Sequence, residues 1–157
     1  MLKNTTIGDL VRDLQAINEV DIWKQVMSDR EINTFVIEQI RLRLQKGQMP
    51  DGSPITNQYT GDDFYKMTTQ IIYSRIGRRI TAGSNYTMKY TGEFYDSISL
   101  LDPDDDYVDI FGENKEVNLF ETYGENLIDL NDENIEKLVE KVKEKYLQKL
   151  RKILLQG

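Results

Sequence analysis

The sequence predicts an α+β protein, in which a small antiparallel sheet with a central hairpin is packed by N-terminal helices and by a long C-terminal helix. Two runs of alternating apolar residues, 90–101 and 107–112, flank a turn rich in Asp, which is typical of a β-hairpin. Apolar residues at helical spacing occur before and after this hairpin. The length of 157 residues predicts that positions 1–157 form a single domain.

The first run of the hairpin contains a turn at Gly92, because glycine adopts the positive φ that other residues resist. Phe94, Ile98 and Leu100 are the apolar positions that follow this turn. They lead into Asp102-Pro103-Asp104-Asp105-Asp106, a segment of five residues with four acids. The hairpin is therefore expected to end in a strongly acidic tip.

Two helical regions are expected at the N-terminal end of the chain. Residues 6–18 form an amphipathic pattern that opens with a variant of the capping box. A longer helical region, 21–46, is expected to break near Ser28, which can cap a second helix carrying Glu31 three positions later. The apolar stripe of that second helix consists of Ile32, Phe35, Val36, Ile40 and Leu44.

The segment 47–61 contains three Gly and two Pro and is expected to be a long loop, either functional or mobile. A further helix is expected over 62–80. Its inward side is predicted to consist of Phe64, Met67, Ile71, Ile72 and Ile76.

After the hairpin, residues 116–123 suit a short helix that Gly124 stops. The last helix, 131–155, is predicted to be capped by Asn131 and to carry acids in its first turn. Its apolar stripe contains Ile135, Leu138, Val139, Val142, Tyr146, Leu150 and Ile153. A helix of this length in a small domain can pack on its own sheet or offer part of its surface to another subunit.

The chain contains no Cys and no His, which excludes disulfides, Cys/His zinc sites and the usual Ser-His and Cys-His nucleophile systems. Carboxylate-bound Mg²⁺ or Mn²⁺ is the catalytic option that remains. The net charge of −7 disfavours wrapping around nucleic acid. No secretory signal and no apolar run of membrane-spanning length are recognised. We expect no cofactor and no enzymatic activity.

Two metal-binding patterns involve the acidic tip. In an EF-hand frame starting at Asp102, Glu113 falls at the chelating twelfth position, but Tyr107 replaces the required glycine, so a solvated turn fits better. Pro103-Asp104 followed by Glu113-Asn114-Lys115 matches the Pro-Asp…Glu-x-Lys order of one nuclease class, in which the acids hold Mg²⁺ and the Lys stabilises charge. A Mg²⁺-dependent nuclease therefore stays an alternative hypothesis.

Tyrosines are concentrated in one third of the chain, at Tyr59, Tyr65, Tyr73, Tyr86, Tyr90 and Tyr95. Tyr is enriched at interfaces because its ring is apolar and its hydroxyl stays hydrated. Ordinary half-buried packing explains the same pattern, and both interpretations stay open.

Several short motifs follow one another along the chain: Met49-Pro50-Asp51-Gly52 after a basic helix end, the helix 62–80, Tyr90-Thr91-Gly92-Glu93-Phe94-Tyr95-Asp96-Ser97-Ile98 before the hairpin, and Phe120-Glu121-Thr122-Tyr123-Gly124 before the last helix. This order resembles a family of small virion-morphogenesis proteins of tailed phages, the tail-completion and head–tail joining group. The resemblance covers about residues 33–155. Residues 126–131 are similar to the variant found in phages of gut Bacteroidota, which suggests a neck-ring protein of a crAss-like phage.

The resemblance implies a non-enzymatic ring subunit in the phage neck, located in the virion and assembled in the host cytoplasm. The implied partners are further copies of the chain in a homo-oligomeric ring, and portal, adaptor and tail proteins; DNA passes without specific binding, and no membrane is involved. The expected interaction residues are Met49, Pro50, Asp51, Gly52, Tyr90, Gly92, Phe94, Tyr95, Asp104, Asp105 and Asp106. We hypothesise that 102–106 faces the ring lumen or solvent, and that 47–61 reaches a neighbouring ring. A small acidic host-directed regulator is a further alternative.

Overall fold

The computed structural model describes residues 12, 17–75, 77, 81–88, 92–115 and 117–156. In chain order, the elements are α2 (Glu19–Met27), α3 (Arg30–Gln45), α4 (Met67–Arg75), α5 (Glu93–Ser97), β1 (Ser99–Leu100), β2 (Ile110–Phe111), α6 (Leu119–Tyr123), the 3₁₀ helix η1 (Glu125–Ile128) and α7 (Asp132–Gln156). The predicted α+β class is confirmed, with helices predominating. The helix expected over 6–18 lies almost entirely outside the described residues.

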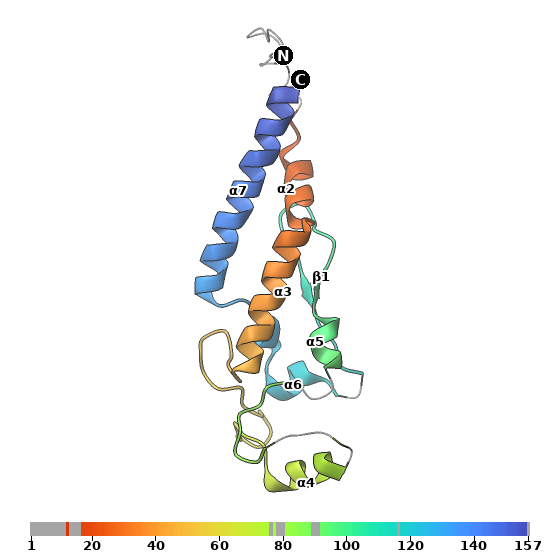
Figure 1. Cartoon of the computed structure of the whole chain (residues 1–157), viewed down its shortest axis with the longest axis vertical. Helices are drawn as coiled ribbons and strands as arrows, with labels where there is room; N and C mark the ends of the chain where they lie inside the picture. The colour runs from red at the N-terminus through yellow and green to blue at the C-terminus, as the bar shows by residue number, and fades with distance from the viewer. Residues whose placement is uncertain are drawn as a thin grey trace.

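Three helices form the long body of the molecule. α2 and α3 follow one another, and α7 runs back along both of them in the opposite direction (Figure 1). The predicted break between α2 and α3 is confirmed, but Ser28 does not cap α3. Ser28 has helical backbone angles and ends α2, whereas Asp29 is extended and accepts the Glu31 N–H at 2.9 Å. An N-cap requires an extended backbone, so Asp29 takes this role.

The predicted hairpin is confirmed but is much shorter than expected. β1 and β2 pair antiparallel over two residues each, with Ser99 opposite Phe111 and Leu100 opposite Ile110. The preceding residues form the short helix α5 instead of a strand. Gly92 does take a positive φ, of 80°, and this turn starts α5. A helical turn buries Phe94, Tyr95 and Ile98 together against the core, which an extended strand with alternating faces would not do.

The core lies where the lower half of α3 meets the hairpin, the 47–55 segment and η1. Its central residues are almost fully buried: Val36, Ile40, Leu44, Ile55, Phe94, Ile98 and Leu127. The predicted stripe of α3 accounts for much of it, so this part of the pattern is confirmed.

The helix predicted over 62–80 is shorter, and its expected inward side is wrong within the described residues. Phe64 is extended and forms a bridge with Asn85, so the helix α4 begins only at Met67. No residue of α4 is buried. α4 lies at the far lower end of the molecule, beyond the core, which is why apolar spacing there does not lead to burial (Figure 1). Ile76 lies outside the described residues.

The C-terminal part agrees closely with expectation. Gly124 ends α6, although α6 begins at Leu119 because the Asn118 side chain caps it. Asn131 caps α7, as predicted, by accepting the Asn134 N–H at 2.9 Å. α7 then extends to Gln156.

Candidate interaction surfaces

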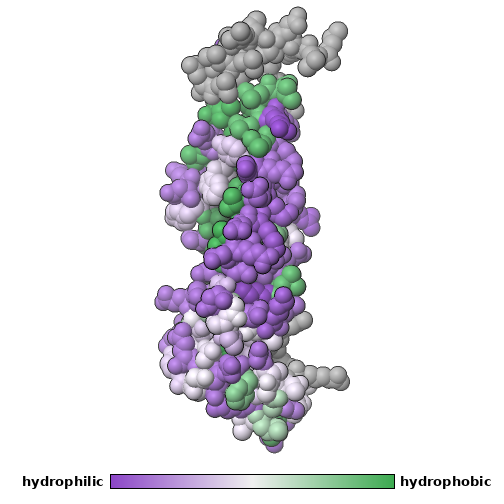
Figure 2. Space-filling model, turned by 90° about the vertical axis from the view of Figure 1, so that its left-hand side faces the viewer, coloured by the Kyte–Doolittle hydropathy of each residue, from purple (hydrophilic) through white to green (hydrophobic). Residues whose placement is uncertain are grey.

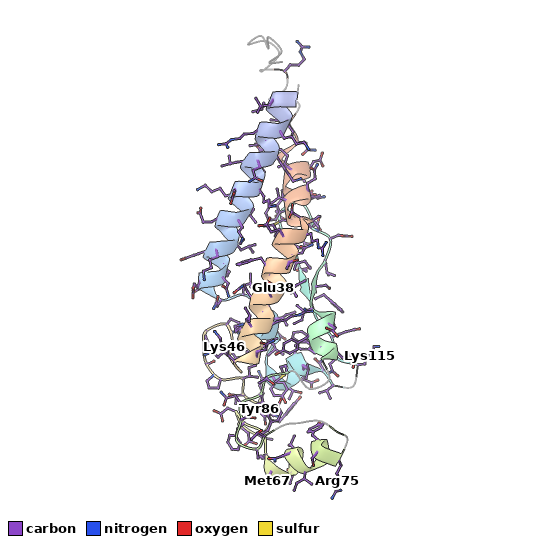
Figure 3. The ribbon with its side chains drawn as sticks, in the orientation of Figure 1. Glu38, Lys46, Met67, Arg75, Tyr86 and Lys115 are labelled. Atoms are coloured by element: carbon purple, nitrogen blue, oxygen red, sulfur yellow. The ribbon has the colours of Figure 1, made fainter. Side chains whose placement is uncertain are left out.

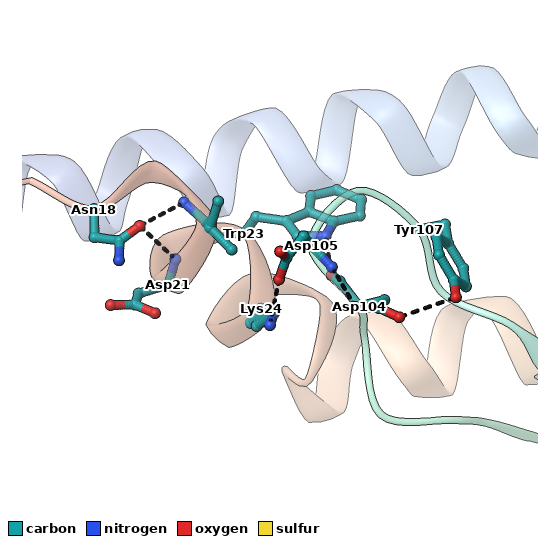
Figure 4. A network of polar contacts seen from close by, with 8 residues as sticks. Asn18, Asp21, Trp23, Lys24, Asp104, Asp105 and Tyr107 are labelled. Atoms are coloured by element: carbon teal, nitrogen blue, oxygen red, sulfur yellow. Dashed lines mark hydrogen bonds and ion pairs between the residues drawn. The ribbon is translucent and has the colours of Figure 1, made fainter.

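The acidic tip, residues 102–106, is anchored to α2. The Trp23 indole donates to the Asp104 carbonyl at 3.2 Å, and Lys24 forms a 2.7 Å ion pair with Asp105 (Figure 4). The Tyr107 hydroxyl donates to the Asp104 carboxylate at 2.9 Å, and this bond lowers the pKa of Asp104. The hydrogen bond to Asp105 raises the pKa of Lys24. The expected interaction residues Asp104, Asp105 and Asp106 are exposed, so the tip is an acidic surface open to solvent.

The hairpin separates the residues of the two metal-binding patterns. Asp104 lies at the tip, whereas Glu113 lies past β2 at the opposite end, where its N–H donates to the Ser97 hydroxyl at 2.8 Å. Lys115 forms a 3.5 Å ion pair with Glu93. Within the described ranges, no group of three or more His, Cys, Asp or Glu residues could hold a metal ion. The structure does not assemble Asp104, Glu113 and Lys115 into one site.

The segment 47–55 has a defined conformation of its own. Gln48 and Pro54 form an antiparallel bridge, and the Asp51 carboxylate accepts the Ser53 N–H at 2.9 Å. The hydrogen bonds from Ser53 lower the pKa of Asp51. Of the expected interaction residues here, Met49 is buried in the core, Pro50 is half-buried, and Asp51 and Gly52 are exposed. A contact with a neighbour would therefore involve the turn 50–53 and not the Met49 side chain.

The expected interaction residues before the hairpin serve packing within the chain. Phe94 and Tyr95 are buried, and the Tyr95 hydroxyl donates to the Thr87 carbonyl. Burial raises the pKa of Tyr95. Arg41 donates to the Tyr95 carbonyl through Nε at 3.0 Å, which ties α5 to α3. Tyr90 lies outside the described residues.

Three of the clustered tyrosines, joined by one from α6, meet at the junction between α4 and the body. The Tyr65 and Tyr86 rings pack edge to face at 4.8 Å between centroids, and Tyr123 lies 5.2 Å from Tyr86. Together with Tyr73 of α4 they line a pocket of about 260 Å³. Burial raises the pKa of Tyr123. These ring contacts pack the segments around Tyr65 and Tyr86 against Tyr123 of α6, which favours the packing interpretation at this place.

α4 offers apolar side chains to solvent at the end of the molecule. Met67 is 63% exposed and Ile72 59% exposed, and Ile71 and Phe64 are exposed beside them. Figure 3 shows Met67 and Arg75 at this end, with Tyr86 above them. The other side of the helix faces the 81–88 segment, since Gln70 accepts the Ala82 N–H at 2.8 Å. We call the outward side of α4, with Phe64, the α4 surface.

A second apolar surface lies between α2 and α7. It is a groove of about 490 Å³ whose lining is apolar apart from one lysine, Lys143: Trp23, Met27, Leu138, Val139, Val142, Lys143, Tyr146 and Leu147. Viewed from the left-hand side of Figure 1, hydrophobic residues form a discontinuous line on a largely hydrophilic surface (Figure 2). The sequence indicated that α7 can offer part of its surface to another subunit but did not locate this groove, and the outward direction of α4 was missed. The width of the apolar stripe of α7, broader than one packed face, was the available signal for the groove.

No helix in the described part of the chain is both long and apolar enough to span a lipid bilayer. Comparison with known proteins finds no family model, no curated protein and no solved structure that matches this chain.

Proposed function

We propose that this chain is a structural subunit of the neck of a tailed-phage virion, a member of a ring between portal and tail, and that it has no catalytic role. The observation that carries the proposal is the α4 surface. A nine-residue helix with no buried residue has little stability by itself, because short helices depend on packing for their stability. Such a helix, exposing Met67 and Ile72, is suited to being covered by another protein.

Two further features support an assembly role. The α4 surface and the α2–α7 groove do not overlap, and two different surfaces on one chain permit the head-to-tail contacts from which rings of identical subunits are built. The acidic tip is held on α2 by Trp23 and Lys24. An acidic surface facing a channel would repel DNA phosphates and let DNA pass without binding. The sequence resemblance points to the same assembly.

The test is mass spectrometry of purified particles of the phage that encodes the chain, together with the molar mass of the chain measured alone and with its portal protein. We expect the chain in the particles at a fixed stoichiometry, and a large complex with the portal protein. Absence of the chain from particles, with no complex formed, would overturn the proposal and favour a host-directed role.

A further inference from the structure

α7 has a second apolar face that α2 and α3 leave uncovered. Leu138 packs against the core, whereas Ile135, Val139, Leu147 and Ile153 are exposed, with Val139 at 55%. Val139 and Leu147 also line the α2–α7 groove. Ile135 and Ile153 are eighteen residues apart, which is five full turns at about 3.6 residues per turn, so both lie on the same line of the helix. We call Ile135, Val139, Leu147 and Ile153 the outer face of α7.

The charges of α7 are divided between its two halves. From 132 to 140, the charged residues are Asp132, Glu133, Glu136, Lys137 and Glu140; from 141 to 155, they are Lys141, Lys143, Glu144, Lys145, Lys149, Arg151 and Lys152. The first half is therefore acidic and the second half basic.

Inward-directed contacts use only some of these basic side chains. Lys145 forms an ion pair with Glu31 at 2.6 Å, and Lys149 donates a hydrogen bond to the Gln25 side-chain oxygen at 3.4 Å. These two contacts hold α7 on α3 and α2. Arg151 and Lys152, in the last turns of α7, stay exposed. The outer face thus has an acidic end and a basic end.

We propose that two copies of this chain associate through the outer faces of their α7 helices, antiparallel and around a two-fold axis near residue 144. This arrangement sets the acidic half of each helix beside the basic half of the other. It brings Ile135 of each chain next to Ile153 of the other, because residue 144 lies midway between them. The occupant of the groove is then a second α7, which contributes its own Val139 and Leu147.

Charge decides the orientation. A parallel pair would place Glu136 and Glu140 beside the same residues of the other copy, and like charges in contact disfavour association. In the antiparallel pair the same acids lie near Arg151 and Lys152. Opposite charges flanking an apolar seam commonly set helix orientation.

The dimer goes beyond the proposed neck function and does not depend on it. A two-fold contact is closed and cannot extend into a ring. The dimer would therefore be a form of the unassembled chain, in which the apolar groove is covered until other contacts replace it.

The absence of native Cys allows a direct test with single-cysteine variants of the full chain. Under mild oxidation, Lys143→Cys should form a disulfide-linked dimer, because residue 143 lies near the axis. Ile135→Cys alone and Ile153→Cys alone should not, since identical residues at these positions would be about 27 Å apart along the axis, at about 1.5 Å per residue. An equimolar mixture of the two should cross-link. Efficient cross-linking of Ile135→Cys by itself would show a parallel pair and overturn the proposal.

Charge reversal tests the same interface without cysteines. We expect the wild-type chain to be a dimer by light scattering at micromolar concentrations. Glu136→Lys with Glu140→Lys, and separately Arg151→Glu with Lys152→Glu, should each weaken dimerisation at least ten-fold, and an equimolar mixture of these two variants should restore it. Circular dichroism should be used as the control that each variant is folded.

Two results would overturn the proposal. One is a wild-type chain that stays monomeric at all concentrations. The other is a monomer in which Cys placed at Lys143 cross-links to Cys placed at Leu10 of the same chain, which would assign the groove to residues 6–18.

Discussion

Arg43 Nη2 lies 2.6 Å from the carbonyl oxygen of Leu127, a residue 84 positions later in the chain. The same guanidinium donates to the carbonyls of Asp129, at 3.0 Å, and Gln48. Arg43 is only 6% exposed, and this burial lowers its pKa. One side chain thus joins the end of α3, the 47–55 segment and the residues around η1.

Replacing Arg43 should destabilise the protein strongly. Arg43→Ala leaves three carbonyls without their donor, and removing a charged donor from buried acceptors costs roughly 3 kcal/mol. Arg43→Lys should recover only part of the loss, because an ammonium cannot reproduce the planar fork. Urea unfolding measures the free energy of unfolding of both Arg43 variants. Arg30→Ala, at an exposed position of the same helix, should stay within about 0.5 kcal/mol of wild type.

Two glycines with left-handed backbones give a matched pair. Gly47 has φ of 69°, and a Cβ there would lie 2.6 Å from Asn85 Cβ and 3.0 Å from the Tyr86 carbonyl oxygen. Gly52 has φ of 84°, with nothing within 4 Å of such a Cβ. Gly52→Ala should therefore cost about 1 kcal/mol, for the backbone conformation alone. Gly47→Ala should cost about 3 kcal/mol, because the overlap adds to that conformational cost. Equal losses in thermal unfolding would contradict the steric account of Gly47.

The α4 surface should be needed for assembly and not for folding. Met67→Gln combined with Ile72→Gln changes two exposed side chains, so the free energy of unfolding should move by less than about 0.5 kcal/mol. If the chain has the proposed neck role, its binding to the adjacent neck component, measured by calorimetry, should weaken at least ten-fold. Leu42→Gln makes the same kind of change at an exposed leucine of α3 and should leave binding intact. Unchanged binding in the double variant would remove α4 from the interface.

The ion pair between α7 and the start of α3 should make the free energy of unfolding depend on pH in the acidic range. Glu31 accepts from Lys145 at 2.6 Å, and this bond lowers the pKa of Glu31 below its usual 4.5. A carboxyl group whose pKa is lowered on folding stabilises the protein above its unfolded pKa, and this contribution is lost as pH falls through the folded pKa. Glu31→Gln should therefore unfold at lower urea than wild type at neutral pH, and the difference should shrink below about pH 4.5.

Glu38→Gln is the control for this prediction. Glu38 is an exposed residue of α3 that forms no ion pair with the described residues. Glu38→Gln should unfold at the same urea concentration as wild type at neutral pH, because it removes no ion pair among the described residues. A difference between wild type and Glu31→Gln that persists unchanged at about pH 3 would show that the ion pair is not its cause.

The sequence by itself determined the features that depend on neighbouring residues. Asn131 caps α7 because an Asn side chain reaches the N–H of the residue three positions later, and Gly92 turns the chain because it has no Cβ. The break between α2 and α3 and the α+β class follow from such local signals. The predicted N-cap of α3, Ser28, was wrong by one residue. Ser28 and Asp29 are both favourable N-cap residues, and only the backbone angles distinguish them.

Only the tertiary structure decided which apolar and charged side chains are buried. Met49 of the predicted contact loop lies in the core, whereas Met67 and Ile72 of the predicted inward stripe face solvent. Periodicity shows that a helix has an apolar side, but burial requires another element opposite that side. α4 lies beyond the core, where no other described element covers Met67 and Ile72. The position of Trp23 against Asp104, 81 residues away, likewise depends on how the hairpin folds back on α2, which no local pattern specifies.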